Sequence, residues 1–137
     1  MLQLPEIEDR IRIHDLFVRY TTAVDDWDEA RVLSCFTEDG VLETPVLGGR
    51  FEGREGQRRF IQTGRTRGEG VQTRHFFSNL GVQLDGNRAT AQSYFVVYST
   101  RNGKSETSVI GRYDCQLRKV GGEWLFSYRG VSIDGKP

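Results

Sequence analysis

The topology of this chain is clearest in residues 81–106, GVQLDGNRATAQSYFVVYSTRNGKSE. Two turn sequences, Asp85-Gly86-Asn87 and Arg101-Asn102-Gly103, flank a stretch rich in aromatic and β-branched residues. Asp-Gly and Asn-Gly steps allow the backbone angles of tight hairpin turns, so we expect the stretch between them to be one strand of two successive hairpins. A further turn at Gly121-Gly122 extends the pattern. It predicts an antiparallel meander with strands over residues 72–84, 89–100, 107–120 and 123–133.

Helical patterns precede the meander. Pro5 suits a first helical turn, acidic residues follow it, and apolar residues recur with the helical period, which predicts a helix over residues 5–24. The cluster Asp25-Asp26-Trp27-Asp28 ends this helix, and Asp28 suits the cap of a second one. We expect the second helix to carry the apolar residues Ala30, Leu33 and Phe36 and to end in a turn at Glu38-Asp39-Gly40.

The remaining elements complete an α+β pattern. Residues 41–46 are typical of a short strand that ends before Gly48-Gly49, and residues 54–66 predict a third, mostly solvated helix. Helices followed by a meander indicate an α+β domain in which the helices cover one face of a curved antiparallel sheet. At this length, residues 1–137 are expected to form a single domain.

Composition and motifs exclude several classes of function. The 19 basic and 19 acidic side chains cancel, so the chain has no overall attraction to nucleic acid. Apolar runs such as residues 95–98 are far shorter than the ~20 residues that cross a bilayer, and the first residues lack the apolar core of a signal peptide. We therefore expect a cytoplasmic protein that binds neither nucleic acid nor membrane. Motifs for phosphate binding, serine hydrolysis and zinc proteolysis are absent, and neither the two cysteines nor the two histidines have the spacing of metal ligands.

His75 is the strongest candidate for chemistry. It lies in the predicted strand TRHFFSN, where Thr73, Phe77 and Asn79 share its face because strand side chains alternate. A carboxylate from the aspartate cluster at the end of the first helix could reach an inward-facing histidine on the sheet. Such a carboxylate would fix the tautomer and stabilise the imidazolium of a general base. The alternatives are a hydrogen-bonded structural role for His75 and a helix-capping role for Asp25.

Longer patterns carry a family resemblance. The segments RYTTAVDDWD, CFTEDGVLE, TRHFFSN and GRYDCQLRKVGGEW, in this order and spacing, resemble the SnoaL-like branch of the nuclear-transport-factor-2 superfamily over nearly the whole chain. The resemblance implies a cone-shaped α+β barrel in which helices cap a highly curved sheet around a deep apolar pocket. Within the superfamily the patterns are most similar to those of scytalone dehydratase, bile-acid 7α-dehydratase and lindane dehydrochlorinase.

This resemblance also implies site residues. Carried over by position, the catalytic residues are Asp25, His75 and Tyr20, with the histidine removing a proton from carbon and no metal or organic cofactor required. For Tyr20 the alternative is a core aromatic residue. Scytalone dehydratase has a second inward histidine where this chain has Arg112 and Asp114, which share one strand face. These two residues could form an ion pair, or Arg112 could bind an anionic substrate group. Arg112, Asp114 and Asn79 are therefore the candidate substrate-binding residues, with Asn79 as a hydrogen-bond donor in the pocket.

The leading functional hypothesis is a cofactor-independent lyase that eliminates water or halide from a small apolar cyclic or aromatic molecule. Isomerisation of the ketosteroid-isomerase type and polyketide cyclisation are rivals, since both also begin by removing a proton next to a carbonyl. A third possibility is a binding module, such as the non-catalytic small subunit of ring-hydroxylating dioxygenases, because one fold hosts many functions. The resemblance further implies a homodimer or homotrimer assembled through the outer face of the sheet.

Overall fold

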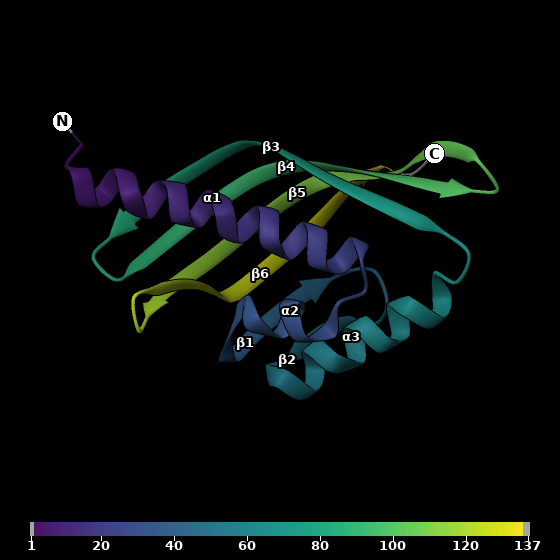
Figure 1. The fold of residues 1–137 in the computed structure, drawn as a ribbon, viewed down its shortest axis with the longest axis horizontal. Coiled ribbons are helices and arrows are strands. Elements are labelled where there is room, and N and C mark those ends of the chain that lie inside the picture. Colours follow the sequence, from purple (N-terminus) through teal and green to yellow (C-terminus); the bar gives the residue numbers. More distant parts are fainter. Residues whose placement is uncertain (1, 136–137) are drawn as a thin grey trace.

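A computed structural model describes residues 2–135. Its helices are α1 (Leu4–Asp25), α2 (Glu29–Ser34) and α3 (Gly53–Arg67), and its strands are β1 (Phe36–Thr44), β2 (Gly49–Glu52), β3 (Gln72–Asp85), β4 (Arg88–Arg101), β5 (Lys104–Val120) and β6 (Glu123–Gly135). The strands form one sheet in the order β2-β1-β6-β5-β4-β3. Figure 1 shows α1 lying across one face of the twisted sheet, while α2 and α3 lie near β1 and β2. The predicted α+β class is confirmed.

The predicted meander is confirmed in full. Strands β3 to β6 pair antiparallel with their neighbours in chain order. Gly86, Gly103 and Gly121 have φ angles of 60°, 75° and 57°, the left-handed region that tight hairpin turns require. The turn sequences therefore specified both the position and the order of these strands.

Two expectations for residues 28–52 are wrong. The second helix ends at Ser34, and residues 36–44, including the expected turn at 38–40, form strand β1. Phe36, the first residue of β1, is buried in the hydrophobic core and packs against Phe126 at a ring-centroid distance of 5.6 Å. The Asp-Gly signal marks a register shift between Phe36 and Val41 in the pairing with β6. The short strand β2 was not predicted.

The sheet is also mixed instead of purely antiparallel. Strand β1 pairs parallel with β6 and antiparallel with β2. Parallel pairing needs a long crossover connection, and β2, α3 and strands β3 to β5 all lie between β1 and β6 in the chain. Together with β2, this pairing extends the sheet beneath α3 and encloses one end of the molecule.

The core lies between α1 and the sheet. Residues of α1 at helical spacing are fully buried, and the Phe17 ring packs edge-on against Phe126 at 5.3 Å. Each large apolar side chain buried in this way contributes about 1.5–3 kcal/mol. The expected third helix is confirmed as α3, which buries Ile61 but leaves all five of its arginines exposed. Within residues 2–135, no helix is both long and apolar enough to cross a bilayer.

Candidate active site

Asp25 and His75 form a close hydrogen-bonded pair. The Nδ1 atom of His75 lies 2.5 Å from Oδ1 of Asp25, and the backbone N–H of His75 donates to Oδ2 at 2.9 Å. The Thr73 hydroxyl donates to Oδ1 at 2.9 Å. Asp25 is 8% exposed, so its carboxylate is satisfied almost wholly by these groups. The structure thus brings together two of the residues that the sequence singled out.

The local structure explains why the pair forms. Asp25 is the last residue of α1, and β3 is an edge strand whose outer side has no neighbouring strand. The backbone N–H of His75 is therefore free to bind the carboxylate. The Gln72 side-chain amide also donates to the backbone carbonyl of Asp25 at 3.2 Å. These contacts attach the end of α1 to β3 and fix the His75 ring with Nδ1 toward the carboxylate.

The electrostatics favour an ionised Asp25. Burial alone would raise its pKa, but the hydrogen bonds and charge of His75, together with the Thr73 hydroxyl, outweigh burial and hold the pKa below the ordinary value of 3.8. An ionised carboxylate at Nδ1 makes this nitrogen the hydrogen-bond donor in the neutral imidazole. The other ring nitrogen, Nε2, is then the one with a free lone pair.

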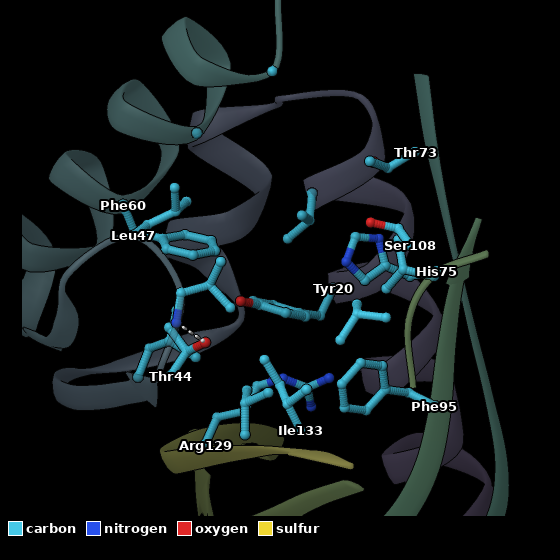
Figure 2. A pocket seen from close by; sticks show the side chains of 18 of the residues that line it. Tyr20, Thr44, Leu47, Phe60, Thr73, His75, Phe95, Ser108, Arg129 and Ile133 are labelled. Carbon is cyan, nitrogen blue, oxygen red and sulfur yellow. Dashed lines mark hydrogen bonds between the residues drawn. The ribbon is translucent and has the colours of Figure 1, made fainter. Parts of the chain in front are cut away.

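His75 lines a cavity of about 400 Å³ between the helices and the sheet. Most of the lining is apolar and comes from α1, α3 and the inner faces of β1, β4, β5 and β6. Figure 2 shows Tyr20, His75, Phe95 and Arg129 around this cavity, with Leu47 and Phe60 across from His75. The volume is in the range of small-molecule sites. The expected deep apolar pocket is therefore present, with His75 in its wall.

Tyr20 lies in the same cavity, as the resemblance implied. Its ring packs against Phe36 and Phe126, and its hydroxyl makes no hydrogen bond with the residues described. Burial raises the pKa of Tyr20 well above its usual range, although the charge of Arg129 opposes this effect. The hydroxyl therefore stays protonated and can donate a hydrogen bond to a bound molecule.

The sequence reasoning missed Arg129, a fully buried arginine that lines the cavity. Its guanidinium carbon lies 3.9 Å from the ring centroid of Tyr113 and 4.4 Å from that of Tyr20. Among residues 2–135 its one hydrogen bond runs from Nη1 to Sγ of Cys115 at 3.6 Å, while Nε and Nη2 have no partner. Aromatic faces stabilise the charge in part. A buried cation without a carboxylate partner favours an anionic ligand group.

A periodic signal could have revealed this arginine. Arg129, Val131 and Ile133 alternate along β6, and all three line the cavity. Counting from the buried Trp124 and Phe126 instead puts Arg129 on the outer face. A register shift between β5 and β6 near Phe126 reverses the phase of the strand, so that Arg129 points inward.

A similar irregularity overturns the expectation for Asn79. It is exposed, does not line the cavity, and has a φ angle of 56°. The β3–β4 pairing shifts register between Ser78 and Gly81, which turns Asn79 outward and places Leu80 on the inner side. Asparagine tolerates this left-handed conformation better than most residues. Asn79 is therefore a bulge residue and not a pocket donor.

The pair of Arg112 and Asp114 is also outside the cavity. Nη2 of Arg112 donates to Oδ1 of Asp114 at 3.0 Å, and both side chains are more than two-fifths exposed on the outer face of β5. Tyr113, between them, points inward and stacks on Phe95 at 4.3 Å. The ion-pair alternative is thus confirmed, and the expectation that Arg112 and Asp114 bind substrate is wrong for this cavity.

No group of three or more His, Cys, Asp or Glu side chains within residues 2–135 is arranged to hold a metal ion.

Residues 5–130 match the SnoaL-like domain. The chain belongs to the SnoaL-like family. No curated protein sequence matches this SnoaL-like chain.

Solved structures with this SnoaL-like fold are numerous. Rv3472 from Mycobacterium tuberculosis, a protein of unknown function, is 29% identical over 95% of this chain and 74% of its own, with a TM-score of 0.85. A provisionally named aromatic ring hydroxylase from Novosphingobium aromaticivorans is also 29% identical, over 93% of this chain and 90% of its own, with a TM-score of 0.80. A provisionally named scytalone dehydratase from the same species is 19% identical over 96% and 87% of the two chains, with a TM-score of 0.82. At 19% identity the likeness concerns the fold alone.

Proposed function

We propose that this protein is a lyase that needs no cofactor and eliminates water or halide from a small, largely apolar cyclic or aromatic molecule in the cytoplasm. The observation that carries the proposal is the Asp25–His75 pair in the wall of the apolar cavity. A general base must be oriented and exposed to its substrate. Asp25 orients the ring through Nδ1, and His75 lines the cavity, so its second nitrogen is available to a molecule that binds there.

The proposed reaction begins at Nε2 of His75. This nitrogen takes a proton from a carbon of the substrate, and the electron pair of the broken C–H bond forms a C=C double bond. The leaving group departs from the neighbouring carbon with the electrons of its own bond. A departing hydroxide takes the proton back from the imidazolium and leaves as water, whereas a departing halide leaves the proton to pass to solvent. Asp25 stabilises the imidazolium between these steps.

Arg129 supplies the electrostatic part of the proposal. Negative charge develops on the leaving group, or on a carbonyl oxygen next to the deprotonated carbon. The unpartnered Nε and Nη2 atoms of Arg129 are donors suited to this charge in a water-poor site. The protonated hydroxyl of Tyr20, whose ring centroid lies 4.4 Å from the guanidinium carbon, is a second donor.

The test is an activity screen in D₂O. Purified protein is incubated with cyclic β-hydroxy ketones and chlorinated cyclohexanes, and the products are analysed by mass spectrometry. We expect loss of water or hydrogen halide from at least one class. His75→Ala should reduce the rate by roughly 10²- to 10⁴-fold, because it removes the general base. His14→Ala is the matched control, since His14 is an exposed histidine on α1 that does not line the cavity.

Equal activity of the wild type and His75→Ala would contradict the mechanism. Deuterium incorporation without loss of a group would instead indicate the isomerase or cyclase alternative, which shares the first step. Ligand binding without any turnover or exchange would indicate a binding module.

A further inference from the structure

Two bulky cavity residues have backbone conformations that bulky side chains rarely adopt. Trp27 has a φ angle of 52° and Leu47 one of 61°, and both line the cavity. The other non-glycine residues with positive φ within residues 2–135 are Asn79 and Asn102, and asparagine tolerates this region. Strained bulky residues of this kind cluster at ligand clamps and active sites.

Both side chains converge on one position of α3. A Cβ atom on Gly64 would lie 2.5 Å from Cζ3 of Trp27 and 3.3 Å from Cδ1 of Leu47. A Cβ atom on Gly68, one helical turn later, would lie 3.2 Å from Cζ2 of Trp27. Glycine weakens a helix interior, so its presence at Gly64 is explained by the close approach of these two side chains. We call Trp27, Leu47 and Gly64 the rim.

A hydrogen bond from α3 also holds the backbone of Trp27, a residue of the rim. Nη2 of Arg65 donates to the backbone carbonyl of Trp27 at 2.5 Å, which ties the loop after α1 to α3. Trp27 also follows Asp25 by two residues, so the same short segment carries a member of the proposed catalytic pair. The loop that carries the indole is thus tied to α3 and, through Asp25, to His75.

The rim lies where the cavity meets solvent. Trp27 and Leu47 are half-buried, and the neighbouring lining residues Val46 and Arg67 are exposed. The inner lining is different, because Leu42 and Arg129 are almost fully buried. Figure 2 shows Leu47 on the side of the cavity opposite His75. A molecule in contact with His75 therefore has its far end against the rim.

We propose that the rim is the specificity determinant of the cavity and limits its ligands to molecules of one or two rings. The indole and the Leu47 side chain occupy the space that a wider, polycyclic ligand would need. The cavity volume of about 400 Å³ lies near the lower end of the range for small-molecule sites, in agreement with a small ligand. This inference rests on the proposed function only in taking the cavity as the ligand site.

The test compares the dissociation constants of 2-naphthol and the tetracyclic 17β-estradiol by isothermal titration calorimetry. We expect the wild type to bind 2-naphthol more tightly. Trp27→Ala and Leu47→Ala should each shift the ratio of the two constants toward estradiol by about 10-fold or more, because both widen the rim. Gly64→Ala should shift the ratio the other way, because the added methyl group puts more bulk where Trp27 and Leu47 already meet α3.

Ile11→Ala is the matched control, since Ile11 is an exposed apolar residue on α1 that does not line the cavity. Its ratio should equal that of the wild type. If Trp27→Ala does not fold, Leu47→Ala decides. An unchanged ratio in the folded variants, or a wild type that binds neither compound, would overturn the inference. Because the readout needs no turnover, a shifted ratio in an inactive protein would refute the lyase proposal and leave the rim proposal standing.

Discussion

At the scale of single residues, Asp25 links stability to pH. Its folded-state pKa lies below the ordinary value of 3.8, so the native protein holds the ionised form more strongly than the unfolded chain does. The resulting stabilisation is complete above pH 3.8 and is lost as the pH falls through the lower folded-state pKa. Asp25→Asn should therefore lower the free energy of unfolding at neutral pH by roughly 1–3 kcal/mol, and its difference from the wild type should shrink in acid.

Urea unfolding at neutral pH and below pH 3.8 measures this effect. Asp15→Asn is the matched control, because Asp15 is an exposed α1 carboxylate whose one ion-pair contact among residues 2–135 is a 4.0 Å approach to His14. It should leave stability nearly unchanged at both pH values. A constant difference between Asp25→Asn and the wild type across the acid range would show that the carboxylate is not held ionised by His75.

Among single residues, Arg129 is also expected to support activity without adding to stability. A guanidinium buried without a carboxylate costs desolvation free energy, which the surrounding aromatic rings repay only in part. Arg129→Met keeps most of the buried stem and removes the charge. We expect its thermal unfolding midpoint to equal or exceed that of the wild type, while any activity found in the elimination screen falls by about 10²-fold or more. A drop in the midpoint together with full activity would assign Arg129 a purely structural role.

At the scale of elements, register shifts in strand pairing explain which features of the fold and the site the sequence does not predict. Hairpin turns and alternation place the β3–β6 meander and the inward face of His75 correctly, and the family resemblance identifies Asp25 as the partner of His75. The errors at Asn79 and the omission of Arg129 both come from register shifts that reverse the phase of a strand. Such shifts depend on pairing with a neighbouring strand, so alternation counted from one end of a strand does not show where its phase reverses.

The bulge at Asn79 gives a prediction at this scale. Asn79→Gly should keep the stability of the wild type, because glycine adopts the φ angle of 56° without strain. Asn79→Val should lower the free energy of unfolding by about 1–2 kcal/mol, since a β-branched residue is disfavoured there. Chemical denaturation measures both. Neither variant should alter ligand binding in the cavity, and a loss of binding in the stable Asn79→Gly variant would restore Asn79 as a pocket residue.

At the scale of the whole molecule, the two faces of the sheet have different roles. The inner face and α1 enclose the core and the cavity, whereas the outer face carries a cross-strand row of Phe76, Val96 and Ile110. Phe76 and Ile110 are 56% and 48% exposed, and Tyr98 packs edge-on against Phe76. Neighbouring exposed apolar side chains of this kind are typical of protein interaction surfaces.

We therefore propose that the protein forms a homodimer or homotrimer through this outer face, and that Ile110→Glu converts the assembly to a monomer. A charge in the middle of the apolar row would have to be desolvated without a partner when two copies meet. Light scattering coupled to size-exclusion chromatography measures the mass. Val18→Glu is the matched control, because Val18 is a similarly exposed apolar residue on α1, away from this face, and its variant should keep the assembly. A monomeric wild type would refute the proposal, and an assembly that survives Ile110→Glu but not Val18→Glu would move the interface to the helical side of the molecule.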